Sequence, residues 1–229
     1  YINKVNDCIA NGHENYAKGL AMGDHKETYW KYALWNFRDA EFWMGQKGVK
    51  LEEVQTSYEV LFADLNKYDG ILNEMNVENI VKKLQAGEFD DVSTVLEKNR
   101  EKAKQIEHVE LRGALDNVLV DPMFLTDSNQ NTPIHLLVRN ANEEGPGVDF
   151  YPILHGRTEE EIVKLVTMKN KCGNMPLLPF ARGASHLLEA VARCPKTVQL
   201  KVVKHYPSDG VPGQLNEFFT QIRREQERL

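Results

Sequence analysis

The sequence predicts an all-α protein. Apolar residues recur at helical spacing along most of the 229 residues, and no convincing alternation of apolar and polar residues marks a strand. The short stretches FYPIL and TVQLKVV are the only strand candidates, and the second also fits a helix. We expect a helical bundle or hairpin over residues 1–75, packed on an irregular helical repeat array over residues 76–229 that ends in a closing C-terminal helix.

The segment 25–48 gives the clearest helix pattern. One face collects large apolar residues, which are Trp30, Ala33, Leu34, Phe37, Ala40 and Met44. Other aromatic residues project elsewhere around the same helix, namely Tyr32, Trp35, Phe42 and Trp43. This distribution favours a central helix of a bundle, and the alternative is an aromatic stripe that binds a partner helix. A second apolar pattern over 51–65 completes an antiparallel hairpin.

From Val77 onward, the pattern changes to shorter helices that are separated by turns. The stretch NVENIVKKLQAGEFDDVSTVLEKN predicts a helix, a break at Ala86-Gly87 and a second helix. A further helix over 109–119 ends before Asp121-Pro122. A helix, a tight turn and an antiparallel helix form the basic unit of several solenoids.

The stretch DSNQNTPIH, from Asp127 to His135, predicts a turn that leads into a capped helix. Thr132 can accept a hydrogen bond from a free amide at the helix start. Pro133 then occupies the first helical position, where its missing N–H carries no penalty. The preceding Asp, Ser, Asn and Gln residues are of the type that closes turns with their own side chains.

This stretch resembles the ankyrin repeat, whose signature is Asp-x-x-Gly-x-Thr-Pro-Leu-His followed by two antiparallel helices. The matching residues are Asp127, Gln130, Thr132, Pro133, Ile134 and His135. Thr158 and Glu161 are suited to cap the second helix of this repeat. A second, degraded copy is NKCGNMPLLPFA, with Asn170, Gly173, Pro176 and Leu177. The resemblance covers about residues 77 to 194 and implies that His135 is a structural strut, not a catalytic group.

Several departures from the family pattern predict an irregular array. Gln130 stands where the family has glycine, and Met175 and Leu178 replace the threonine and histidine of the second copy. Pro133 and Pro176 are 43 residues apart, whereas the family period is about 33 residues. We assign the extra residues to the Gly- and Pro-containing loop NEEGPGVDFYPILHGR.

Composition excludes several classes of function. A net charge of −6 and a pI of about 5.7 provide no basic surface for nucleic acid or an anionic membrane. Cys8, Cys172 and Cys194 are far apart and form no CxxC pair, so neither disulfides nor a zinc site is indicated. No apolar run reaches the roughly 18 residues of a membrane helix, and no glycine-rich phosphate loop is present. We therefore expect a cytoplasmic protein without a cofactor.

The resemblance implies a protein–protein interaction module that uses the concave face and turn tips of the array. The residues placed there are Phe124, Asn129, Gln130, Arg139, Asn140, Lys171 and Arg182. Phe150 and Tyr151 form a separate candidate, because loop aromatics are either packed into the core or open to a partner. Such arrays joined to other helical domains also resemble bacterial effectors, which act in the host cytosol. The alternative is an enzyme, a cysteine hydrolase or transferase, whose site lies in the helical region or outside this sequence. One candidate is Cys172 as the nucleophile with His186 or His155 as its base.

Overall fold

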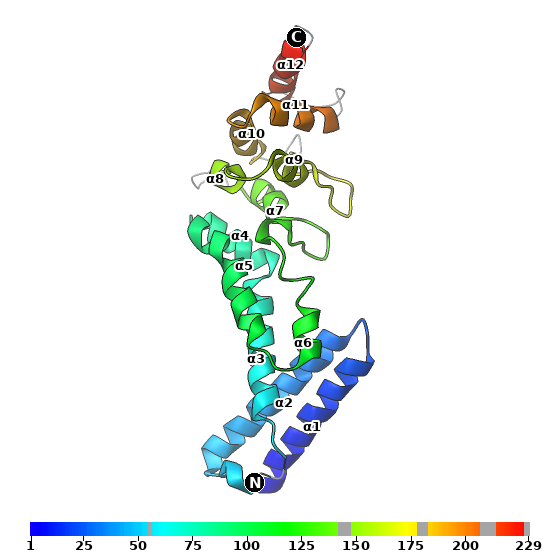
Figure 1. Cartoon of the computed structure of the whole chain (residues 1–229), viewed down its shortest axis with the longest axis vertical. Coiled ribbons are helices and arrows are strands. Elements are labelled where there is room, and N and C mark those ends of the chain that lie inside the picture. Colours follow the sequence, from blue (N-terminus) through cyan, green and yellow to red (C-terminus); the bar gives the residue numbers. More distant parts are fainter. Residues whose placement is uncertain (55, 142–147, 178–182, 207–213, 227–229) are drawn as a thin grey trace. The chain divides into compact units, whose positions relative to one another are not determined.

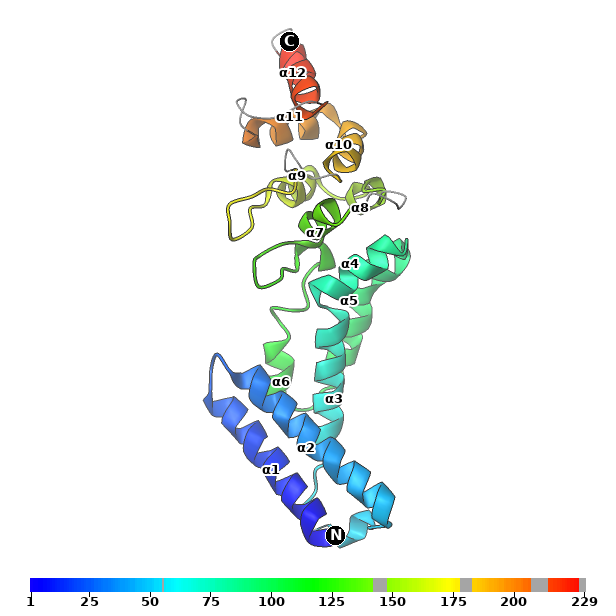
Figure 2. The same cartoon turned by 180° about the vertical axis from the view of Figure 1, so that it is seen from behind.

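In a computed structural model, every regular element of the described residues is helical (Figures 1 and 2). The structure describes residues 1–54, 56–141, 148–177, 183–206 and 214–226, and none of these residues forms a strand. The prediction of an all-α protein is confirmed. Both strand candidates are helical, since α8 spans Tyr151–Leu154 and α11 spans Lys196–His205. None of the described helices is both long and apolar enough to cross a membrane.

The chain forms two compact units. The first contains residues 1–74 and 97–119, and the second contains residues 75–96 and 120–229. The domains expected from the sequence, residues 1–75 and 76–229, are each continuous, whereas both of these units are built from two segments. Helix α5, Phe89–Lys104, belongs to the second unit up to Leu96 and to the first from Glu97.

A long helical hairpin dominates the first unit. Helices α1, Ile2–Ala21, and α2, Lys26–Lys47, contact each other along their length (Figure 1). The short η1, Leu51–Glu53, leads to α3, Glu59–Glu74, and α6, Val109–Ala114, packs on α3. The apolar face expected for α2 is buried, with Phe37 and Ala33 both 0% exposed.

The outer face of α2 is open. Tyr32, Trp35 and Phe42 are 43, 55 and 56% exposed, so α2 is buried on one side and does not occupy the central position that its aromatic content predicted. Gly48 ends the helix in the left-handed conformation with φ of 64°, as expected for a glycine at that site.

The second unit is a succession of short helices. They are α4, Val77–Gln85; the first part of α5; η2, Pro122–Phe124; α7, Pro133–Arg139; α8; α9, Glu159–Thr167; α10, Ala184–Ala192; α11; and α12, Gln214–Gln226. Contacts join α4 to α7, α8 to α10 and α9 to α11. Each helix is too short to be stable alone, so burial against neighbours supplies the stability.

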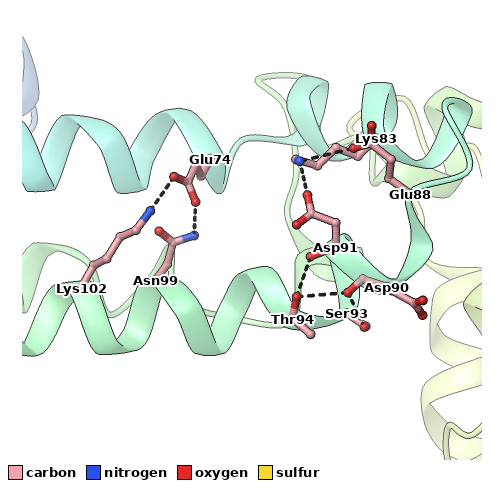
Figure 3. A network of polar contacts seen from close by, with 9 residues as sticks. All are labelled: Glu74, Lys83, Glu88, Asp90, Asp91, Ser93, Thr94, Asn99 and Lys102. Carbon is pink, nitrogen blue, oxygen red and sulfur yellow. Dashed lines mark hydrogen bonds and ion pairs between the residues drawn. The ribbon is translucent and has the colours of Figure 1, made fainter.

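Polar contacts join neighbouring helices within each unit (Figure 3). Within the first unit, Glu74 accepts from Lys102 Nζ at 2.5 Å and from Asn99 Nδ2 at 3.2 Å. Within the second, Lys83 pairs with Asp91 and with Glu88 across the turn at Gly87. The three ion pairs are partly exposed, so each contributes modestly to stability, roughly 0–1 kcal/mol, whereas the Asn99 side chain that bonds to Glu74 is buried.

Candidate functional site

Two turns of the second unit have the same internal structure. In the first, the Oδ1 atom of Asp127 accepts from the backbone amides of Asn129 and Asn131, both at 2.8 Å. In the second, 43 residues later, Asn170 Oδ1 accepts from the amides two and four positions on, both at 3.0 Å. The aspartate and asparagine therefore close equivalent turns with their side chains.

The glycine position of both turns has a left-handed backbone. Gly173 has a φ of 79° and Gln130 a φ of 59°, and Gln130 is the one non-glycine residue with positive φ in the described part of the chain. The first turn thus has the same left-handed conformation as the second, although a glutamine stands at the glycine position. This conformation is strained for residues with a Cβ atom, so a specific network has to hold the turn.

Hydrogen bonds join the two turns directly. The amide of Lys171 donates to the carbonyl of Asn129 at 2.9 Å, and Asn170 Nδ2 donates to Asn131 Oδ1 at 2.8 Å. The two turn tips therefore lie side by side. Asp127 anchors this arrangement: burial alone would raise its pKa, but the hydrogen bonds from Asn131 and Asn129 lower it below the usual range.

His135 ties α7 to the second turn, as the resemblance implied. Thr132 caps α7, and its backbone amide donates to His135 Nδ1 at 3.2 Å. Since Nδ1 accepts, the proton lies on Nε2, which donates to the carbonyl of Asn174 at 3.0 Å. Burial lowers the pKa of His135, against the opposing effect of its contacts with the backbone of Asn174 and Met168. The neutral ring is thus a buried strut.

Five of the predicted binding residues are exposed around these turns. Asn129, Gln130 and Lys171 project from the turn tips, and Arg139 and Asn140 lie at the C-terminal end of α7. The carbonyl of Asn129 and the amide of Lys171 are engaged in the inter-turn bond, while their side chains face solvent. The bond between the turns brings Asn129 and Lys171 together, whereas Arg139 and Asn140 lie at the other end of the helix that follows the first turn.

The other predicted residues differ in their surroundings. Phe124 is half-buried, with Lys164 Nζ 4.7 Å from its ring centroid. Phe150 is 1% exposed and belongs to the core. Of the two alternatives for this loop residue, packing into the core and contact with a partner, the structure has the first. We therefore remove Phe150 from the candidate surface. Tyr151 is half-buried under the guanidinium of Arg193, 3.7 Å away. Arg182 lies outside the described residues.

The geometry gives the cysteine-enzyme alternative no support. Cys172 is exposed in the second turn, and no hydrogen bond joins it to His155 or His186 in the described part of the chain. Burial raises the pKa of the thiols of Cys8 and Cys194, which makes both poorer nucleophiles. Within the same residues, no group of three His, Cys, Asp or Glu side chains is placed to hold a metal ion.

Sequence reasoning missed the asparagines that link the turns. Asn131 and Asn170 were treated only as turn formers and Asn174 was given no role, yet each also bonds across to the neighbouring turn or helix. The available signal was the 43-residue offset, which aligns Asp127 with Asn170 and Asn131 with Asn174.

The fold and the paired turns together define a helical protein in which one side-chain-closed turn is repeated, and the first copy leads into a capped helix. Searches against protein-family models, curated proteins and solved structures each returned no match.

Proposed function

We propose that the second unit is an irregular ankyrin-like array that binds another protein through its turn tips and the exposed end of α7. The observation that carries this proposal is the pair of turns with the same hydrogen bonds, 43 residues apart and bonded to each other. Stacked repeats present such turns along one edge, where partners of repeat proteins commonly bind.

Contacts between alternate helices support the stacked arrangement. The α8 helix packs on α10 and α9 on α11, and Tyr206 after α11 donates its hydroxyl to the carbonyl of Val166 in α9 at 2.7 Å. The spacing is uneven, because α9 and α11 begin 37 residues apart while the turns are 43 apart. An array of this kind buries the apolar flank of each helix against the next unit.

The binding surface can be tested with two matched triple variants. The first changes Asn129, Arg139 and Lys171 to alanine, and all three side chains are exposed at the turns and α7. The control changes Gln85, Lys82 and Lys204, which are exposed elsewhere on the second unit, so that both variants lose one amide and two positive charges. Pull-down of the full chain identifies a partner, and its recovery is then measured with each variant.

We expect recovery of the partner by the turn variant to fall about tenfold or more. The residues that dominate an interface typically cost over ~1 kcal/mol of binding free energy each when they are truncated to alanine. The control variant should recover it unchanged. Equal recovery by both variants would rule out the turn surface. Delivery into a host cell as an effector is a further part of the proposal, and a translocation reporter fused to the chain tests it separately.

A further inference from the structure

The first unit contains an open pocket, and none of the residues that line it belongs to the turn surface of the second unit. Its volume is about 520 Å³, and it is lined by residues of α1, of the start of α3 and of the segment between α5 and α6. This volume lies within the range that binds small molecules or single side chains. The polar groups of the lining determine which chemistry it can hold.

His108 presents a hydrogen-bond acceptor to this pocket. Its Nδ1 lies 2.8 Å from Oδ2 of Asp64, whose side chain is 2% exposed and which also accepts the amides of Glu107 and His108. Because a carboxylate only accepts, the proton lies on Nδ1. In the neutral ring, Nε2 is then an acceptor, and no described residue hydrogen-bonds to it.

His13 presents a second acceptor by the same reasoning. Its Nε2 lies 3.1 Å from the carbonyl of Ser57 and therefore donates, which leaves Nδ1 as the acceptor of the neutral ring. The ring meets Phe37 edge to face at 5.3 Å, which fixes its orientation. The Ser57 hydroxyl donates to Glu59 at 2.8 Å, so it is not placed as a nucleophile for either histidine.

The surroundings of the pocket are acidic and aromatic. Glu107 lines it with a third acceptor, and the rings of Tyr16 and Tyr58 form part of its wall. Burial, with the charges of Glu110 and Asp64, raises the pKa of Tyr16 to about 12. Two cations bond to neighbouring residues, Lys67 to Asp64 and the carbonyl of Gln105 and Arg112 to the carbonyl of Ile106, but neither lines the pocket. A positively charged ligand is therefore favoured.

The acceptors of this pocket do not form a metal site. Within the described residues, no three His, Cys, Asp or Glu side chains are close enough to hold a metal. A ligand that satisfies His13, His108 and Glu107 together must carry several separated N–H donors. A guanidinium group has five donors in a rigid plane, sheds water more easily than an ammonium group and stacks on aromatic rings.

We propose that this pocket binds a guanidinium group. The two possible sources are the side chain of an arginine in a partner protein and a free guanidinium compound. Both would place N–H donors on His13 Nδ1, His108 Nε2 and the carboxylate of Glu107, with the plane of the group against a tyrosine ring. The site is independent of the proposed binding surface of the second unit.

Calorimetry on the full chain at about pH 8, where histidine side chains are ordinarily neutral, tests this site. The probe is Nα-acetyl-arginine amide, and its matched control is the citrulline analogue, which has nearly the same shape and no charge. We expect saturable binding of the arginine probe and at least about tenfold weaker binding of the citrulline and lysine analogues. Equal binding of the citrulline or lysine analogue, or no binding of the arginine probe, would overturn the proposal.

Variants locate the site. Glu107→Gln keeps the shape of an exposed side chain and should weaken the arginine probe about threefold to tenfold, because one partner charge is lost. Glu101→Gln removes the same charge from an exposed position on α5 outside the pocket and should leave binding unchanged. An unchanged affinity for Glu107→Gln would place the probe elsewhere and refute the assignment. Tighter binding of a Gly-Arg-Gly peptide than of methylguanidinium indicates a protein source, and the reverse indicates a free compound.

Discussion

Helix α1 approaches α2 closely at Gly12, and this contact provides the sharpest stability test of the fold. A Cβ atom at position 12 would lie 2.4 Å from Cε1 and 2.7 Å from Cδ1 of Phe37, whereas carbon atoms in contact are normally about 3.5–4.0 Å apart. Phe37 is 0% exposed and is enclosed by the rings of His13, Tyr58 and Phe62. It cannot move by the required ångström without displacing one of them.

Two opposing effects set the magnitude for Gly12→Ala. Alanine is better than glycine in a helix interior by roughly 0.5–1 kcal/mol, while overpacking a core costs typically about 1–3 kcal/mol. We expect a net loss of about 1–2 kcal/mol in the free energy of unfolding. Gly45→Ala is the matched control, because Gly45 lies in α2 with nothing within 4 Å of the added Cβ atom. It should gain roughly 0.5–1 kcal/mol.

The assay is urea unfolding followed by tryptophan fluorescence. Trp30, Trp35 and Trp43 are the three tryptophans of the chain, and all lie in α2, so the signal reports on the first unit. The two variants should shift the midpoint in opposite directions with little change in slope. A Gly12→Ala protein as stable as the wild type, alongside a stabilised Gly45→Ala protein, would refute close packing of α1 on α2.

Two further predictions concern Asp64 and the turns. Burial would raise the pKa of Asp64, but hydrogen bonds from His108 and the backbone lower it below the usual value of 3.8. The ionised Asp64 carboxylate therefore stabilises the folded protein at neutral pH, and this stabilisation is lost as the pH falls through the lowered pKa. The Asp64→Asn variant should therefore be about 2–4 kcal/mol less stable than the wild type at pH 7. When unfolding is measured across pH, this difference in the free energy of unfolding should narrow below about pH 4. A difference that does not depend on pH would contradict this explanation. Substitutions at the two positions with left-handed backbone should have opposite effects on the free energy of unfolding. Gln130→Gly should raise it by up to about 1 kcal/mol, and Gly173→Gln should lower it by about 1–2 kcal/mol. Thermal unfolding measures both, and a loss of stability in Gln130→Gly would show that the glutamine side chain itself supports the turn.

Local signals in the sequence predicted much of the fold. The Thr132-Pro133 start of α7 and the Thr158 capping box with Glu161 of α9 both form as expected, because a cap is specified by residues within one helical turn. The buried face of α2 was likewise predictable, since periodicity identifies the side that packs.

Tertiary features escaped this reasoning. Asp64 lies on the apolar face of α3 and is stabilised by donors 43 and 44 residues further on, a pairing that no local pattern encodes. Phe150 follows a Gly- and Pro-containing stretch typical of exposed loops but is buried. Periodicity also cannot indicate how many faces of a helix are covered, and for this reason the sequence left open whether Trp35 and Phe42 are buried in a bundle or exposed, as the structure has them.

The paired turns separate the requirements of folding from those of recognition. Asp127, Asn131 and Asn170 form the side-chain bonds that hold the turns together, whereas Asn129 and Lys171 contribute only backbone atoms to the link between them. Folding therefore constrains the residue type at the first three positions and leaves the side chains at the last two free to vary. A partner is best encoded at positions where folding makes no demand. Substitutions at the inner positions should accordingly reduce stability, and substitutions at the outer positions should change binding at constant stability.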